Sequence, residues 1–317
     1  MKSKFLFDHI PKTAGVSLHE AFAKLFPKYT KPNDIANFYH AIINQPDRDF
    51  VGGHFVFQPG NKLSPSHYHC TVLRDPVQRF ISQYFFNRQV GEQLFIRREL
   101  SDIRLTDPQV LTSLRCSIDE YVTFEGFIKD TFSNVQALHF AARITGAPSK
   151  LNDKNLMDAA IASLEGYDLV GSMKNLQGFV DAIAQDFSLD TVTLHQLNVT
   201  RKDTSRRQLK KDTLEVLKKA NAVDYKILHW ASQRFGWESG ALPKLYNDTV
   251  ERVVLPELST SETDSSISGE DLVQAMDYGD KLIKIKSPTL KFLNQLALQD
   301  NLNLYPSYLK NRFTLPR

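Results

Sequence analysis

Two hydrophobic patterns follow one another near the start of the chain. The first is a short apolar run, typical of a central parallel strand, that comprises Phe5, Leu6, Phe7 and Ile10. Pro11 ends this strand because it has no N–H to donate to a neighbouring strand. The second pattern is an apolar stripe at helical spacing, formed by Leu18, Phe22 and Leu25. The segment is therefore predicted to fold as a strand, a tight loop and a helix that packs back onto the sheet.

The same alternation of strand and helix recurs further along the chain. Residues 69–73 (HCTVL) are predicted to form another buried strand, and Asp75 and Pro76 after it are a favourable N-cap and first helical residue. Further strands are predicted at residues 49–57 and 168–173, and an amphipathic helix at 176–187. Strands that alternate with helices build parallel sheets. We therefore expect an α/β fold in three layers, with a central parallel sheet, a P-loop-like first strand–loop–helix and many flanking helices.

The first loop has the composition of an anion-binding site. Its small residues, Thr13, Ala14 and Gly15, allow a ligand to approach the backbone closely, and Ser17 is expected to open the helix. Consecutive N–H groups and the N-terminus of the helix would then point at an anion, and Lys12 would add a mobile positive charge. The sequence thus predicts a phosphate-like ligand at this loop.

The loop differs from the P-loop of ATPases and GTPases, because Pro11 precedes the lysine and no Gly-Lys pair occurs. Residues 9–18 (HIPKTAGVSL) instead resemble the 5′-phosphosulfate loop of sulfotransferases. These enzymes use 3′-phosphoadenosine 5′-phosphosulfate (PAPS), and the likeness is greatest to Golgi carbohydrate sulfotransferases and their bacterial relatives. The resemblance implies that the 5′-phosphosulfate is bound by Pro11, Lys12, Thr13, Ala14, Gly15, Val16 and Ser17.

A second motif supports this resemblance. Arg74 follows the strand at residues 69–73, and ligands of open α/β sheets bind at the carboxyl ends of strands. Its planar guanidinium suits a phosphate dianion, and Ser82 lies two turns along the following helix. Residues 74–84 (RDPVQRFISQY) resemble the family's 3′-phosphate motif, in which an arginine and a serine have this separation. A basic segment with Arg201 and Lys202 is similar to the loop that closes over the nucleotide, although a plain surface charge run remains open.

Two residues are candidates for the catalytic base. Gly53 and His54 match the Gly-His that carries the base in hexuronic-acid 2-O-sulfotransferases. Glu20 follows Lys12 by eight residues, the separation at which glucosaminyl sulfotransferases place a catalytic glutamate. We favour His54, since neutral imidazole is well matched to accepting an alcohol proton. A core histidine and a solvated helix glutamate are the structural alternatives.

Composition narrows the class of protein. The chain has 317 residues and a formal net charge of +3, which is too small to imply nucleic-acid or membrane binding. The two cysteines favour a reducing compartment, and the seven residues before the first loop are too short for a signal peptide. We therefore expect a cytoplasmic and bacterial protein. The histidines show no metal-binding spacing, so no metal is expected.

The resemblance ends near residue 237. We expect a PAPS-binding domain at residues 1–237 and a helical extension at 238–317, with a linker at 256–271 that contains no lysine or arginine. The predicted function is transfer of a sulfuryl group from PAPS to a hydroxyl of a carbohydrate or glycosylated metabolite, with PAP (3′-phosphoadenosine 5′-phosphate) as product. The alternatives are a nucleotide-dependent kinase and a non-catalytic nucleotide-binding protein of the same fold. The sequence does not predict the oligomeric state.

Overall fold

A four-stranded sheet organises the fold. The computed structural model describes residues 2, 4–29, 50–55, 63, 65–96, 107–123, 131–195 and 209–237. The strands are β1 (Lys4–Asp8), β2 (Phe50–Gly53), β3 (His67–Leu73) and β4 (Leu169–Ser172). Their order is β2-β1-β3-β4 and every pairing is parallel. All four carboxyl ends therefore lie at the same edge of the sheet, as predicted.

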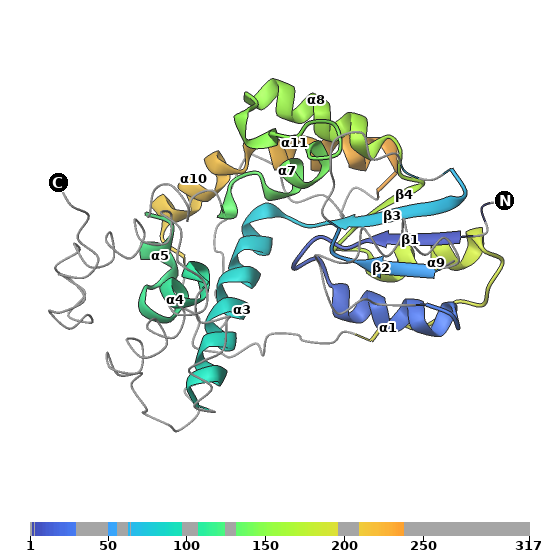
Figure 1. Ribbon diagram of the computed structural model, residues 1–317, viewed down its shortest axis with the longest axis horizontal. Coiled ribbons are helices and arrows are strands. Elements are labelled where there is room, and N and C mark those ends of the chain that lie inside the picture. The colour runs from blue at the N-terminus through green and yellow to red at the C-terminus, as the bar shows by residue number, and fades with distance from the viewer. Residues whose placement is uncertain are drawn as a thin grey trace, which may run out of the picture. The chain divides into compact units, whose positions relative to one another are not determined.

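Helices cover both faces of this sheet (Figure 1). One face carries α1 (Gly15–Leu25) and α9 (Leu176–Asp186). The other face carries α7 (Val135–Ala141), α8 (Asp153–Leu164) and α11 (Ala222–Arg234). The remaining helices are α3 (Pro76–Ile96), α4 (Pro108–Arg115), α5 (Ile118–Tyr121), α10 (Lys211–Ala220) and the 3₁₀ turn η2 (Pro148–Lys150). The predicted three-layer α/β architecture is confirmed.

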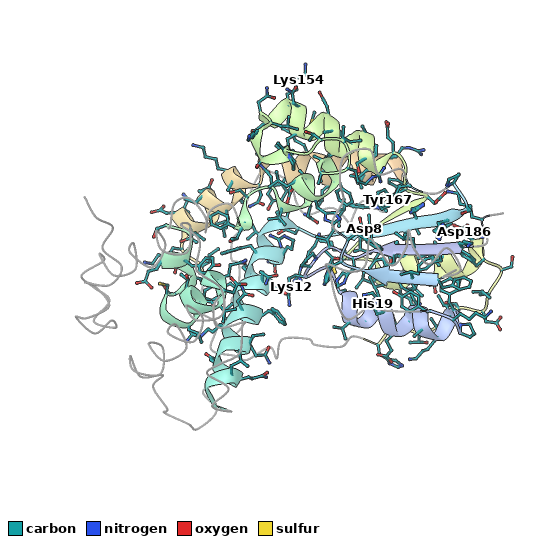
Figure 2. The ribbon with its side chains drawn as sticks, viewed as in Figure 1. Asp8, Lys12, His19, Lys154, Tyr167 and Asp186 are labelled. Atoms are coloured by element: carbon teal, nitrogen blue, oxygen red, sulfur yellow. The ribbon has the colours of Figure 1, made fainter. Side chains whose placement is uncertain are left out.

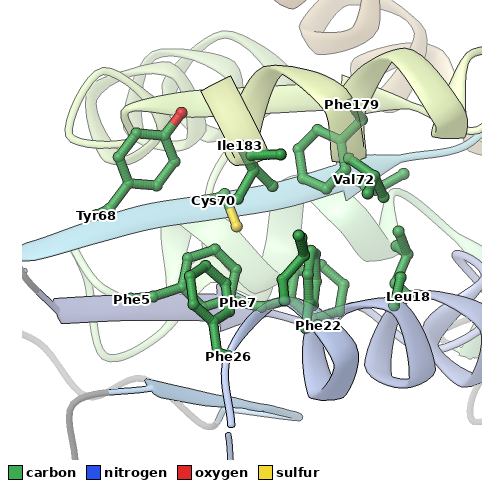
Figure 3. Close-up of a cluster of buried hydrophobic side chains, with 14 residues drawn as sticks. Phe5, Phe7, Leu18, Phe22, Phe26, Tyr68, Cys70, Val72, Phe179 and Ile183 are labelled. Atoms are coloured by element: carbon green, nitrogen blue, oxygen red, sulfur yellow. The ribbon is translucent and has the colours of Figure 1, made fainter. Parts of the chain in front are cut away.

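The apolar stripe of α1 packs onto β1 and β3, as its spacing predicted. Leu18 and Phe22 are fully buried beside Phe5 and Phe7, and α9 closes the same cluster (Figure 3). The rings of Phe5 and Phe22 meet edge to face, with centroids 4.9 Å apart. This packing fixes the start of α1 against the end of β1, and so it fixes the loop between them.

Helix α1 begins two residues earlier than predicted. Ser17 was expected to open the helix, but the first helical residue is Gly15 and the N-cap is Ala14. Ala14 adopts the left-handed conformation, with φ of 61°, and makes no side-chain cap. A left-handed residue turns the chain into the helix at once, so Ser17 lies buried within the first turn.

The chain forms two compact units, which we describe separately. The first comprises the described residues within Met1–Phe80, Ser133–Lys202 and Leu214–Val253, and it contains the sheet. The second comprises those within Ile81–Phe132 and Asp203–Thr213. In the second unit, the Tyr84 hydroxyl donates to the Cys116 carbonyl at 2.5 Å, and the rings of Tyr84 and Tyr121 pack edge to face. The predicted extension at 238–317 lies outside the described residues, and its boundary stays a prediction.

Candidate active site

The loop between β1 and α1 has an unusual backbone. Lys12 has a φ of 72° and Ala14 a φ of 61°, a region that residues other than glycine seldom adopt. The Thr13 hydroxyl and N–H both donate to the Ile10 carbonyl, at 2.9 Å and 3.3 Å, which closes the turn. Left-handed residues that lead into a helix aim successive N–H groups at one point and form an anion-binding nest. Such strain clusters at ligand-binding loops. The backbone of this loop therefore has the geometry of an anion-binding nest.

Gly15 is required by the packing of His9. A Cβ atom at position 15 would lie 1.7 Å from Cε1 of His9, closer than any tolerated contact. The His9 ring therefore occupies the space that a side chain on residue 15 would fill. The other residues of the loop differ in exposure: Thr13 is buried, while Val16 is 47% exposed.

Arg74 connects the two predicted motifs. Its Nη1 donates to the Lys12 carbonyl at 2.8 Å, across 62 residues of sequence. Asp75 caps α3 as predicted, because its carboxylate accepts from the Gln78 N–H at 2.8 Å. The first helical residue is Pro76. The guanidinium of Arg74 and the loop from Pro11 to Ala14 therefore lie together at the edge of the sheet.

Two half-buried cations make this site electrostatically unfavourable without an anion. Burial, with a further contribution from Arg74, lowers the pKa of Lys12 to about 8. Burial also lowers the pKa of Arg74, against a smaller opposing effect of Asp75. Lys12 lies beside the N-terminal end of α1 (Figure 2). A bound dianion would stabilise both charges, so the site favours an anionic ligand.

A buried glutamine holds the backbone of Arg74. Gln136, in the first turn of α7, accepts from the Arg74 N–H at 3.0 Å and donates to the Arg74 carbonyl at 2.8 Å. Asp224 of α11 in turn accepts from the N–H groups of Gln136 at 3.2 Å and Ala137 at 2.7 Å. Gln136 was not predictable from the sequence, since a single glutamine in a helix carries no functional signal.

Helices α7 and α11 cap each other, which rigidifies this support. The side-chain oxygen of Asn134 accepts from the N–H groups of Val223 at 3.0 Å and Asp224 at 3.2 Å. Asp224 caps α7 in the opposite direction through its two hydrogen bonds. Tyr225 also donates to Asp75 at 3.2 Å and so ties α11 to the start of α3. The position of Arg74 thus depends on α7, α11 and the start of α3.

His54 lies directly after β2 and beside the end of β1. Its Nδ1 is 2.6 Å from the His9 carbonyl oxygen, and the two rings stack with centroids 4.2 Å apart. The His9 N–H donates to the Gly53 carbonyl at 2.9 Å and extends the parallel pairing by one residue. The predicted strand at 49–57 is shorter than expected, since β2 ends at Gly53. Because β2 ends at Gly53, His54 is not part of the sheet, and its position is fixed by its contacts with His9.

The end of β1 is anchored by a buried carboxylate. Asp8 is fully buried and accepts from the Tyr167 hydroxyl at 2.5 Å, and His139 Nε2 lies 3.0 Å from both of its oxygens. Figure 2 labels Asp8 and Tyr167 near the strand ends. This network fixes the residue that precedes His9. It therefore supports the His9–His54 contact.

The other predicted site residues fall elsewhere. Glu20 lies on α1 and pairs with Lys24 one turn later at 2.9 Å, and this hydrogen bond lowers the pKa of its carboxyl. Ser82 lies on α3 in the second compact unit, so its relation to Arg74 stays a prediction. Arg201 and Lys202 lie outside the described residues.

Comparison with known proteins identifies the family. The sequence model that describes the sulfotransferase family matches residues 1–231, which is most of the chain. The chain belongs to the sulfotransferase family. The predicted membership of the sulfotransferase superfamily is thus confirmed, and the match spans both the Lys12 loop and Arg74.

Other comparisons are more distant. The sulfotransferase is similar to the crystal structure of a sulfotransferase from Alicyclobacillus acidocaldarius, with 16% identity and a TM-score of 0.43 over 76% of this chain and 99% of that one. No curated protein gives a significant match.

None of the helices in the described ranges combines the length and hydrophobicity needed to cross a bilayer. In the same ranges, no group of three or more His, Cys, Asp or Glu side chains is arranged to hold a metal ion.

Proposed function

We propose that this sulfotransferase transfers a sulfuryl group from PAPS to an alcohol. The observation that carries the proposal is the hydrogen bond from Arg74 to the Lys12 carbonyl. It joins an anion-binding loop to a guanidinium at one sheet edge, and PAPS carries two separate anionic groups, a 5′-phosphosulfate and a 3′-phosphate. In this proposal the loop from Pro11 to Ser17 holds the 5′-phosphosulfate, and Arg74 holds the 3′-phosphate. Ser82, Arg201 and Lys202 are proposed as further contacts of the nucleotide.

His54 is the proposed catalytic base. A carbonyl oxygen only accepts hydrogen bonds, so the contact with His9 places a proton on Nδ1 of His54. The lone pair of the neutral ring is then on Nε2, which accepts the proton of the acceptor hydroxyl. Glu20, which is paired with Lys24, remains the rival base.

The proposed reaction is an in-line displacement at sulfur. The acceptor oxygen forms a bond to sulfur as its proton passes to His54, and the bond between sulfur and the bridging oxygen breaks. The electron pair of that bond stays on the 5′-phosphate of PAP, where the ammonium of Lys12 stabilises the developing charge. The balance requires no metal ion and no redox partner.

The acceptor is proposed to be a hydroxyl on a sugar or a sugar-containing metabolite. This part rests on the likeness of the Gly53-His54 pair and the Lys12 loop to carbohydrate sulfotransferases. Residues 1–237 would supply the PAPS-binding domain, with residues 238–317 as an extension. A small-molecule acceptor agrees with the small net charge of the chain.

Calorimetric titration of the full chain tests the donor. PAP should bind in the presence of a metal chelator, and ATP with magnesium should bind far more weakly. Preferential binding of ATP with magnesium would instead support a kinase. A second assay should follow transfer of labelled sulfuryl from PAPS to a panel of free sugars and glycosides, with Lys12→Ala as the inactive control. Tight PAP binding without transfer to any alcohol or to water would support the non-catalytic alternative.

A further inference from the structure

Arg79 is a buried cation with no ion-pair partner among the residues that the structure describes. It lies in the first turn of α3, five residues after Arg74, and its N–H donates to the Asp75 carbonyl at 2.8 Å. The residue is 2% exposed. Within the described part of the chain, its Nε and Nη2 are buried and make no hydrogen bond. Buried arginine donors in folded proteins are almost always paired, so this one requires an explanation.

The acidic group that attracts Arg79 already accepts hydrogen bonds from other residues. Asp224 attracts Arg79 electrostatically, but its two oxygens accept from the N–H groups of Gln136 and Ala137. No ion pair joins Arg79 to a carboxylate among the residues described. Burial lowers the pKa of Arg79 to about 10, with Asp224 opposing this effect and Arg74 adding to it. The guanidinium is thus desolvated and lies close enough to Arg74 to be repelled by it.

An anionic ligand would offset both the desolvation of the Arg79 guanidinium and its repulsion by Arg74. A phosphate dianion accepts several hydrogen bonds and is commonly bound by more than one arginine. Arg74 and Arg79 come from one short segment. Gln136, which is bonded to Asp224, fixes the backbone of Arg74. Asp224 also attracts the charge of Arg79. The segment thus carries two guanidinium groups, and in Arg79 two buried N–H donors make no hydrogen bond among the described residues.

We propose that Arg79 is a second arginine of the 3′-phosphate site, with Nε and Nη2 donating to the phosphate held by Arg74. The inference rests on the proposed PAPS-dependent function. It assigns to Arg79 a binding role for which the sequence motif gave no indication. A free 3′-phosphate, rather than the adenine or the 5′ group, is the feature of the ligand that Arg79 recognises.

The isosteric change Arg79→Met separates ligand binding from a structural role. If the proposal holds, Arg79→Met should weaken PAP by about ten- to a hundredfold, while binding of adenosine 5′-monophosphate changes less than about twofold. The melting temperature of the ligand-free protein should stay the same or rise, because an unsatisfied buried charge is removed. Arg234→Met, at an exposed position on α11, is the matched control for the change in charge.

Three other outcomes would be informative. Equal losses for the two ligands, or an unchanged affinity for PAP, would overturn the role of Arg79. A lower melting temperature with unchanged PAP selectivity would show that Arg79 is structural. If Arg74→Ala also fails to discriminate PAP from adenosine 5′-monophosphate, the proposed function fails rather than this inference alone.

A measurement on the wild type covers the case in which Arg79→Met does not fold. The Nε–Hε resonance of Arg79, assigned by comparison with Arg79→Lys, should shift when PAP is added and should not shift with adenosine 5′-monophosphate. Arg79→Lys should keep part of the PAP affinity, since it retains the charge and loses the planar donor pair. A resonance that ignores PAP in the wild type would overturn the proposal.

Discussion

The imidazole of His54 stacks on that of His9 while its Nδ1 bonds to the His9 carbonyl oxygen at 2.6 Å. One residue therefore fixes both the plane and the tautomer of the proposed base. The same His9 ring fills the space beside Gly15, the first residue of α1, which directly follows the Lys12 loop. Through His9, the position of the proposed base is coupled to the position of the loop.

Replacing the proposed base should slow turnover strongly while nucleotide binding stays nearly intact. His54→Ala should lower the rate of sulfuryl transfer by roughly 10²–10⁴-fold, because no group remains to take the acceptor proton. PAP affinity should change little, since His54 follows β2 and is not part of the loop. Steady-state rates, calorimetry with PAP and a thermal melt on the same preparation check these three expectations.

Glu20→Gln tests the rival base. We expect a mild effect, because Glu20 is already paired with Lys24 on the α1 surface. An inactive Glu20→Gln beside an active, folded His54→Ala would transfer the role to Glu20. It would also place the protein nearer the glucosaminyl branch of the family than the hexuronic-acid branch.

Arg74→Ala should discriminate between nucleotides by their 3′-phosphate. The loss of a charge-assisted hydrogen bond should cost PAP on the order of 2–3 kcal/mol of binding free energy. Adenosine 5′-phosphosulfate, which lacks the 3′-phosphate, should lose far less. Calorimetry of both ligands checks this, and similar losses for the two would remove Arg74 from the 3′-phosphate site.

The meeting of the Lys12 loop and Arg74 was predictable from the sequence, because it depends on local patterns. The apolar run before Pro11 and the one before Arg74 each predict a strand, and parallel strands bring their ends to one edge. The contact between Arg74 and the Lys12 carbonyl follows from that geometry. The helix start at Gly15 was not predictable, because it depends on a left-handed conformation of Ala14. Only a glycine would have indicated such a conformation in the sequence.

The supports of the site could not be predicted from the sequence. Gln136 bonds to Arg74 across 62 residues and Asp224 bonds to Gln136 across 88, and only the tertiary packing of α7 and α11 brings them there. The burial of Arg79 was hidden for the same reason, since an arginine in an amphipathic helix is normally solvated. The roles of Gln136 and Asp224 follow from their hydrogen bonds. The role proposed for Arg79 follows from two buried donors that make none among the described residues.

Gly15→Ala should damage the loop through His9. The added Cβ would lie 1.7 Å from the His9 ring, so the ring must move and cannot keep its stacking on His54. Overpacking of this kind costs about 1–3 kcal/mol of unfolding free energy. Denaturant unfolding should show this loss, and the double variant His9→Ala/Gly15→Ala should recover part of it. No recovery in the double variant would mean that His9 is not the cause of the clash.

The lowered pKa of Lys12 gives the last prediction, which concerns proton uptake on binding. In the free protein Lys12 loses its proton as the pH rises through about 8, because burial and Arg74 disfavour its charge. A bound polyanion favours the charged amine and raises its pKa again. Below about pH 7 the amine is charged in both states and contributes no uptake. Above pH 8 binding must recruit the proton, so PAP affinity should fall by up to about tenfold per pH unit.

Calorimetry at pH 9 in two buffers of different ionisation enthalpy measures this uptake directly. The wild type should take up close to one proton per PAP, and Lys12→Ala should lose that uptake. The exposed Lys154 on α8 offers a matched control, since Lys154→Ala should behave as the wild type does. Uptake that persists in Lys12→Ala would assign the proton to another group. Because a charge that develops late is stabilised most in the transition state, Lys12→Ala should also reduce turnover at pH 7 more than it reduces PAP affinity.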